Sequence, residues 1–175
     1  MTLALSEAVE TNTALGTPLS LSSLLLHQFR NYETARIEID ARPVVLVGNN
    51  GAGKTNILEA VSLFTPGRGI RREKLSELGK ISATLTWAIS AQVNGMQGLV
   101  HIGTGRDPEA DMSSEKRILK IDGKIAKSHA ELGKHLSMIW LTPQMEQLFQ
   151  EGTSAGRKFL DRLVFSFDSD HASRI

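Results

Sequence analysis

Hydrophobic and polar residues alternate near the start of the chain with the period of two that is typical of a strand with one buried face. The alternation predicts strands over residues 19–29 and 34–39, the second with Ala35, Ile37 and Ile39 facing inward. Because only a short connection separates them, the two strands are expected to pair in antiparallel fashion.

Alternation returns in the middle of the chain, where Asn94-Gly95 and Asp122-Gly123 are dipeptides that favour tight hairpin turns. Residues 103–116 are polar and contain Gly and Pro, so they are expected to form a surface loop. The strands expected around these turns span residues 81–93, 98–102, 117–121 and 124–127.

The last third of the chain has mainly helical patterns. Ser128 followed by Glu131 matches the capping box that begins a helix, and this helix is expected to end near Leu136. Residues 138–141 form a short apolar run that predicts a strand. Two further helices are expected over residues 143–150 and 154–167.

Residues 44–64, VVLVGNNGAGKTNILEAVSLF, join an apolar run to a glycine-rich turn and then to a helical pattern. The run at 43–47 is rich in β-branched residues and predicts a buried parallel strand. The helix is expected to turn an apolar face to the core and to leave its polar residues elsewhere. The apolar face consists of Ile57, Leu58, Val61 and Phe64, and the polar positions are Asn56, Glu59 and Ser62.

The turn fits the phosphate-binding pattern G-x-x-x-x-G-K-[ST], and the strand and helix that this pattern requires are predicted on either side. Glycines let backbone N–H groups close around phosphate oxygens at the positive end of the helix. Lys54 would then face the β- and γ-phosphates of ATP, and Thr55 would hold Mg²⁺. The alternative is a glycine-rich turn that contains Lys-Thr by chance. The motif residues expected to bind nucleotide are Gly48, Asn49, Asn50, Gly51, Ala52, Gly53, Lys54, Thr55 and Asn56.

The composition is that of an ordinary globular chain. Of its 175 residues, 41% are hydrophobic and 22% are charged, which indicates one domain or part of a larger one. The apolar runs are too short to span a membrane, and the absence of cysteine excludes disulfides and fits a reducing, cytoplasmic location. Residues 1–18 lack the pattern of a secretory signal and are interpreted as a flexible leader, so the domain is expected to occupy residues 19–175.

Charge patterning leaves the partner open. The formal net charge is +1, so the whole molecule has no field that would indicate a nucleic-acid partner. A basic segment nevertheless follows the predicted phosphate-binding helix, and either a solvated loop or a DNA contact would explain it. This basic segment contains Arg68, Arg71, Arg72, Lys74 and Lys80, set against Glu73 and Glu77.

Several motifs of other P-loop proteins are missing from the sequence. Neither Asn-Lys-x-Asp nor Asp-x-x-Gly follows the turn, which argues against a Ras-like GTPase. No run of four apolar residues ends in Asp-Glu, so the carboxylate that holds Mg²⁺ in P-loop ATPases is not found. The nearest candidate, residues 164–168, lies on the apolar stripe of a predicted helix.

Four motifs, in this order, resemble the N-terminal half of the RecF family, which comprises bacterial recombination and gap-repair ATPases related to the ABC-type heads of the SMC class. They are Phe29 to Tyr32, Val47 to Ala60, Pro66 to Arg71, and Arg157 to Asp161. The resemblance covers nearly everything after the leader. It implies an α/β fold of the P-loop NTPase class: the N-terminal lobe of an ABC-type ATPase head, with a mixed sheet, an antiparallel meander and the P-loop helix.

The resemblance also implies a function. Two heads of this class sandwich two ATP molecules, and the homodimer acts on DNA at gaps or junctions with RecO and RecR, in replication, repair and the SOS response. The signature loop, Walker B carboxylates and switch His of such heads lie in the C-terminal half, and none is found here. The chain is therefore expected to be half of a composite site, which binds ATP but does not hydrolyse it well alone.

Three residues outside the P-loop carry over from the family. Arg30 falls where such heads place a basic residue near the nucleotide, although an arginine in solvent at a strand end would look the same. Arg71 matches the arginine that follows the P-loop helix and touches nucleotide or DNA. Gln144 falls at the loop whose Gln reaches Mg²⁺, and it departs from the acidic residues that RecF relatives carry near there. The helix containing residues 157–161 is expected to be structural.

Two other functions stay open from the residues alone. The missing carboxylate also fits a nucleotide-binding regulatory module that is complete in itself. The other alternative is a P-loop kinase for a small substrate, because Arg71-Arg72 could take the place of a lid cluster.

Overall fold

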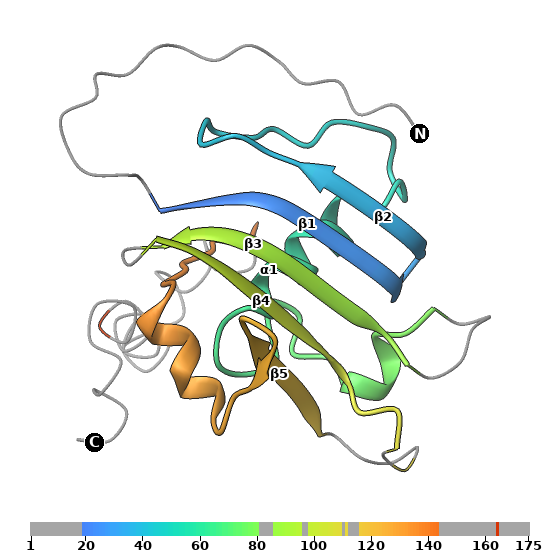
Figure 1. The fold of residues 1–175 in the computed structure, drawn as a ribbon. Coiled ribbons are helices and arrows are strands. Elements are labelled where there is room, and N and C mark those ends of the chain that lie inside the picture. The colour runs from blue at the N-terminus through green and yellow to red at the C-terminus, as the bar shows by residue number, and fades with distance from the viewer. Residues whose placement is uncertain are drawn as a thin grey trace, which may run out of the picture.

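The computed structural model describes residues 19–80, 86–95, 98–109, 111, 116–143 and 164. The described strands form a six-stranded antiparallel sheet in the order β2-β1-β3-β4-β5-β6, with helix α1 beside it (Figure 1). The elements are β1 (Ser20–Phe29), β2 (Tyr32–Glu38), α1 (Lys54–Ser62), the 3₁₀ helix η1 (Leu75–Glu77), β3 (Ala88–Gly95), β4 (Gly98–Arg106), β5 (Arg117–Ile121), β6 (Lys124–Ile125) and the 3₁₀ helix η2 (His129–Lys134).

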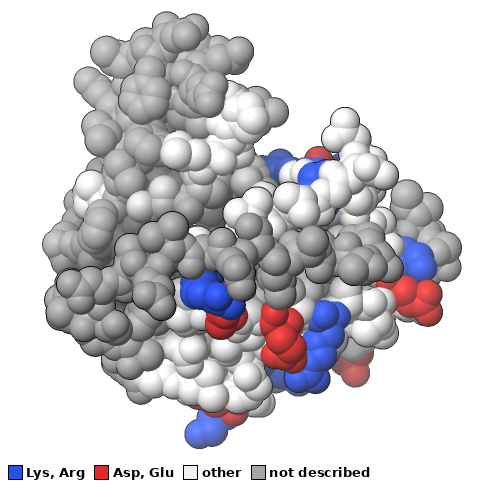
Figure 2. Space-filling model, turned by 90° about the horizontal axis from the view of Figure 1, so that it is seen from above, with Lys and Arg blue, Asp and Glu red and all other residues white. Residues whose placement is uncertain are grey.

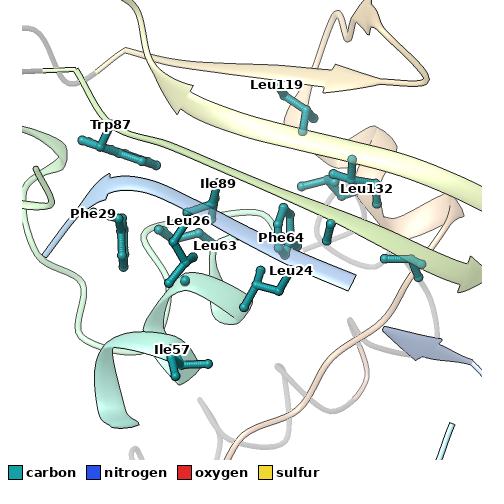
Figure 3. Close-up of a cluster of buried hydrophobic side chains, with 14 of the residues drawn as sticks. Leu24, Leu26, Phe29, Ile57, Leu63, Phe64, Trp87, Ile89, Leu119 and Leu132 are labelled. Atoms are coloured by element: carbon teal, nitrogen blue, oxygen red, sulfur yellow. The ribbon is translucent and has the colours of Figure 1, made fainter. Parts of the chain in front are cut away.

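One face of the sheet is apolar and carries the core. In β1, Leu24 and Leu26 are fully buried while Leu25 between them is 39% exposed, as strand alternation requires. The buried side chains of the sheet pack with Leu63 and Phe64, which follow α1 directly (Figure 3). Burial of this apolar surface is the main force that holds α1 against the sheet, and so fixes the P-loop at the start of α1.

The hairpins of the sheet are confirmed, but one predicted turn is wrong. β1 pairs with β2, and β5 with β6, as expected. In the β3–β4 hairpin, Asn94 pairs with Leu99 and Gly95 pairs with Gly98. Asn94 and Gly95 therefore belong to the strand and not to the turn, because the pairing register overrides the local turn preference.

β4 extends through the first part of the predicted loop at 103–116. Gly105 lies so close to the neighbouring strand that a Cβ there would be 2.5 Å from the Trp87 carbonyl oxygen. Thr104 is buried and donates a hydrogen bond to the Ile118 carbonyl. Polar and glycine residues thus continue the strand because a neighbour on each side supplies backbone partners, a long-range effect that composition does not show.

Two predicted strands are absent. Residues 43–47 and 138–141 have no strand pairing. Some of their apolar side chains face solvent, such as Val45 at 65% exposed and Leu141 at 73% exposed, whereas Leu46 and Met138 pack partly buried against the core. A buried parallel strand needs hydrogen-bonding neighbours and cover on both faces. Among the described residues, every strand is already committed to the antiparallel sheet, so these two runs have no neighbour to pair with.

The buried face of α1 also differs from the prediction. Leu58, expected in the core, is 51% exposed, whereas Glu59 and Ser62 are 1% and 2% exposed. The helix is turned so that Ile57 and Ala60 meet the core. Glu59 can lie on this side because arginines satisfy its charge, as the site geometry shows.

Arg117 joins the sheet to the end of α1. Its side chain is 8% exposed, and it donates to the carbonyl oxygens of Leu63 at 2.9 Å and of Thr65 at 3.3 Å. A cation is favourable at this end of a helix, where carbonyl groups lack intrahelical partners. Burial lowers the pKa of the Arg117 guanidinium to about 10, at which it stays protonated near neutral pH.

The capping box is confirmed at the start of η2. Ser128 and Glu131 make both of its hydrogen-bond contacts, although the element is a 3₁₀ helix that ends at Lys134, two residues before the predicted end. Other predictions lie wholly or almost wholly outside the described residues: the leader at 1–18, the first half of the strand predicted at 81–93, the helices at 143–150 and 154–167, Gln144, and residues 157–161.

Candidate phosphate-binding site

The glycine-rich turn leads directly into α1. Gly51 and Gly53 have φ values of 83° and 96°, a left-handed conformation that glycine adopts without strain. Gly53 is the N-cap of α1, no side chain among the described residues caps the helix, and its first turn holds no acidic residue. The first N–H groups of the helix therefore keep their partial positive charge for an anionic ligand.

Lys54 lies across the turn. Its ammonium group donates to the carbonyl oxygens of Gly48 at 2.6 Å and Asn49 at 2.8 Å. Thr55 is exposed beside it, as are Gly48, Asn49, Asn50 and Gly51, while Ala52, Gly53, Lys54 and Asn56 are half-buried. The motif therefore forms an open cradle with one cationic side chain at its centre.

The β1–β2 turn supports the cradle from behind. Tyr32 Oη donates to the Ala52 carbonyl at 3.4 Å, and Asn56 Nδ2 donates to Asn31 Oδ1 at 2.8 Å. Burial raises the pKa of the Tyr32 phenol. At Gly53 the approach is closest, because a Cβ there would lie 2.5 Å from Tyr32 Oη and 2.8 Å from Asn31 Nδ2.

A buried ion-pair cluster lies beside the cradle. Glu59 accepts hydrogen bonds from Arg30 Nε at 2.8 Å and Arg30 Nη2 at 2.6 Å, and one from Arg71 Nη1 at 3.1 Å. Arg71 Nη1 also donates to Asn56 Oδ1 at 3.1 Å. The hydrogen bonds to Glu59 raise the pKa of the Arg30 guanidinium. Arg30 and Arg71, which are far apart in sequence, thus meet next to the P-loop.

Glu59 is the residue that sequence reasoning missed. Helical periodicity alone predicts that Glu59 lies on the polar side of the helix, away from the core. One signal could have found it: between Asp40 and Glu73 it is the only acidic residue, and two arginines that flank the P-loop need a counter-charge.

Two cations of the basic segment have acidic partners in the structure. Arg71 pairs with Glu59, and Lys80 Nζ lies 3.4 Å from Glu33 Oε2, while Arg72 and Lys74 are exposed. Figure 2 shows one face of the molecule on which Lys and Arg atoms lie beside Asp and Glu atoms and form no continuous basic area.

The donor set fits phosphate better than it fits a metal alone. Within the described residues, no three His, Cys, Asp or Glu side chains form a group that could hold a metal ion. The Thr55 hydroxyl is one oxygen ligand, and Mg²⁺ requires six, which phosphate oxygens and water commonly supply.

Within the described residues, no helix is both long and apolar enough to cross a membrane.

The family model described as "RecF/RecN/SMC N terminal domain" matches residues 20–145. That span contains the entire described sheet, the P-loop, Glu59 and both arginines. The chain belongs to this family. The α/β class and the expected P-loop ATPase head are therefore confirmed, although the described sheet is antiparallel throughout.

Relatives within the family share much of the sequence. The chain is 47% identical over 154 residues to "DNA replication and repair protein RecF" of Rhizobium rhizogenes (strain K84 / ATCC BAA-868), and 49% identical over 156 residues to the protein of that name from Agrobacterium fabrum. The matches cover 88% and 89% of the chain, but only 40% and 41% of the relatives. The chain thus spans about two fifths of their length.

Solved structures agree with this placement in the family. "Structure of the recombination mediator protein RecF-ATPrS in RecFOR pathway" superposes with a TM-score of 0.75 at 27% identity, over 87% of this chain and 40% of that one. An SMC structure, described as "Structural biochemistry of ATP-driven dimerization and DNA stimulated activation of SMC ATPases.", gives 0.63 at 19% identity, over 82% and 98%. The second likeness shows a shared fold alone.

Substitution of Gly53 by alanine tests the contact between the turn and the P-loop. Gly53→Ala and Gly51→Ala both place a Cβ at positive φ, which costs about 1–2 kcal/mol each. Only Gly53→Ala also forces atoms apart, because no atom lies within 4 Å of a Cβ at residue 51. Overpacking adds about 1–3 kcal/mol, so urea denaturation should show a clearly larger loss for Gly53→Ala. Equal losses would mean that the two segments do not touch in solution.

Proposed function

We propose that the chain is the ATP-binding half of a DNA-repair ATPase of the RecF family. The observation that carries the proposal is the open, uncapped start of α1 beneath Lys54, in a chain that belongs to this family. Two solved relatives are described as RecF-ATPrS and RecF-ATP, which supports ATP as the ligand. Thr55 would hold Mg²⁺, which would neutralise part of the triphosphate charge when bound.

Binding would use groups that the fold already places. Backbone N–H groups at the start of α1 would donate to the ligand, and the ammonium of Lys54 would exchange two neutral carbonyl partners for a charged phosphate. The exchange is favourable because a hydrogen bond between two charged groups is stronger than one to a neutral carbonyl. The nucleotide contacts of the motif residues Gly48 to Asn56, of Arg30 and Arg71, and of Gln144 remain part of the proposal.

Hydrolysis would need further groups. Phosphoryl transfer to water depends on positioned charge and an oriented water, and the carboxylate of Glu59 in α1 is committed to Arg30 and Arg71. The chain alone is therefore expected to bind ATP with negligible turnover. The exposed apolar side chains in the runs at 43–47 and 138–141, such as Val45 and Leu141, favour this divided site over a self-contained module, because exposed apolar surface of this kind suits packing against a further part of the protein.

The partners follow from the same family. ATP-dependent homodimerisation on DNA, at gaps or junctions, is the function expected of a RecF-family ATPase head, and the exposed Arg72 and Lys74 could contact DNA phosphates. Action with RecO and RecR in the cytoplasm is the finer proposal, which the name "RecFOR pathway" of one related structure supports.

Removal of the Lys54 ammonium tests nucleotide binding. Hydrogen bonds to charged groups contribute about 1.5–3 kcal/mol, so Lys54→Ala should weaken ATP binding tenfold or more. Lys124→Ala is the matched control, since Lys124 is exposed in β6 at the opposite edge of the sheet from β2. Isothermal titration calorimetry measures both. Equal ATP affinity in Lys54→Ala and the parent would rule out the P-loop assignment.

The salt dependence of DNA binding tests the basic segment. Each phosphate contact adds about 0.9 to the slope of log K against log salt on duplex DNA. Arg72→Ala and Lys74→Ala should each lower the slope by about that amount, and Arg42→Ala, which removes an exposed arginine paired with Asp40, should not. Fluorescence anisotropy over a salt series gives the slopes. An unchanged slope and affinity in both variants would mean that the basic segment is a solvated loop that does not contact DNA.

A further inference from the structure

The cluster around Glu59 contains more positive than negative charge. One carboxylate faces two guanidinium groups, so the cluster of Glu59, Arg30 and Arg71 has a net charge of +1. Glu59 is nearly without solvent contact, and a buried carboxylate is strongly unfavourable unless it is paired. Arg30 alone, with its two-pronged contact, already satisfies that need. Arg71 is therefore the surplus cation.

The two arginines differ in exposure and in the number of guanidinium nitrogens that are still available to donate a hydrogen bond. Arg30 is 17% exposed, and its Nε and Nη2 donate to Glu59 while its Nη1 donates to the Glu77 carbonyl at 3.0 Å. Arg71 is 38% exposed. Within the described residues, its hydrogen bonds to Asn56 and Glu59 both use Nη1, so Nε and Nη2 remain for another acceptor.

Arg71 is fixed at both ends. The preceding Ile70 donates its backbone N–H to Ser62 Oγ in α1 at 2.8 Å, which holds the backbone against the helix. The guanidinium end is held by Glu59 and by Asn56, the residue that follows the last motif position Thr55. A cation on a long, flexible side chain is thus held beside the first turn of α1, where the P-loop expects phosphate.

We propose that Glu59 is a positioning residue that holds the Arg71 guanidinium beside the start of α1, so that Arg71 donates to a phosphate group of the bound nucleotide. The proposal rests on the proposed function, because the phosphate in question belongs to ATP. Arg71 makes the contact with the ligand, and Glu59 acts through Arg71. Arg30 serves as the counter-ion that keeps Glu59 charged in its buried place.

The sign of one substitution separates positioning from simple electrostatics. Glu59→Gln removes a negative charge near a triphosphate, and Coulomb attraction alone would then make ATP bind more tightly. If Glu59 positions Arg71, the same substitution releases the cation and ATP binds more weakly. Glu77→Gln is the matched control, because it removes an exposed negative charge near Arg30 but keeps the backbone carbonyl of residue 77 that accepts from Arg30 Nη1. This variant should bind ATP at least as well as the parent.

The experiment is a double-mutant cycle, with ATP affinity measured by calorimetry on Glu59→Gln, Arg71→Ala and the double variant. Each single substitution should weaken binding about tenfold, the value of one hydrogen bond to a charged group. The double variant should bind within about twofold of either single variant, because both remove the same contact. Parent-like or tighter binding by Glu59→Gln, or losses that multiply to about a hundredfold, would overturn the proposal.

A second readout covers the case in which Glu59→Gln does not fold. The Nε–H signals of Arg30 and Arg71 in the parent protein can be followed by NMR, with Arg71→Ala for assignment. Saturating ATP should shift the Arg71 signal, and an unmoved Arg71 signal with ATP bound would overturn the proposal. If Lys54→Ala loses ATP while Glu59→Gln binds as the parent does, the proposed function stands and the role of Glu59 falls. If the parent itself binds no ATP, both fall.

Discussion

The proposed phosphate-binding site depends on one carboxylate that has almost no contact with water. Glu59 is 1% exposed, and a charge in such a place is tolerated only with partners, since removing one partner of a buried pair costs about 3–5 kcal/mol. The partners come from two segments that are distant in sequence, the β1–β2 turn and the stretch after α1. The requirement to neutralise Glu59 therefore draws both segments to the same turn of α1, and the P-loop lies between them.

The hydrophobic core and the site are continuous through Arg30. Phe29, the residue before it, is fully buried and packs edge-to-face on Trp87, with ring centroids 5.6 Å apart. Trp87 in turn donates from Nε1 to the Leu75 carbonyl at 2.8 Å, and the Arg30 N–H donates to the Leu78 carbonyl at 2.8 Å. Arg30 takes a positive φ of 55° at this point, which is costly for a residue with a side chain. Packing on one side and the Glu59 ion pair on the other hold it there.

Sequence patterns predicted the features that are local and missed those that depend on distant partners. The P-loop, the capping box at Ser128 and the Asp122-Gly123 hairpin each follow from a few neighbouring residues, and all have the expected backbone form. The run at 43–47 has strand composition but no strand beside it among the described residues, so it stays unpaired. The inward turn of Glu59 depends on arginines located 29 and 12 positions away. A helical pattern is read from the polarity of single residues, so it cannot show an ion pair between Glu59 and arginines that are distant in sequence.

The most direct test is a crystal structure of the protein with a non-hydrolysable ATP analogue. Phosphate oxygens should lie within hydrogen-bond distance of the backbone N–H groups at the start of α1, and Lys54 Nζ should have moved from the carbonyls of Gly48 and Asn49 onto a phosphate. The Glu59 carboxylate should keep Arg30 in the liganded state. A nucleotide bound elsewhere, or one bound here while Lys54 stays on the two carbonyls, would contradict the account.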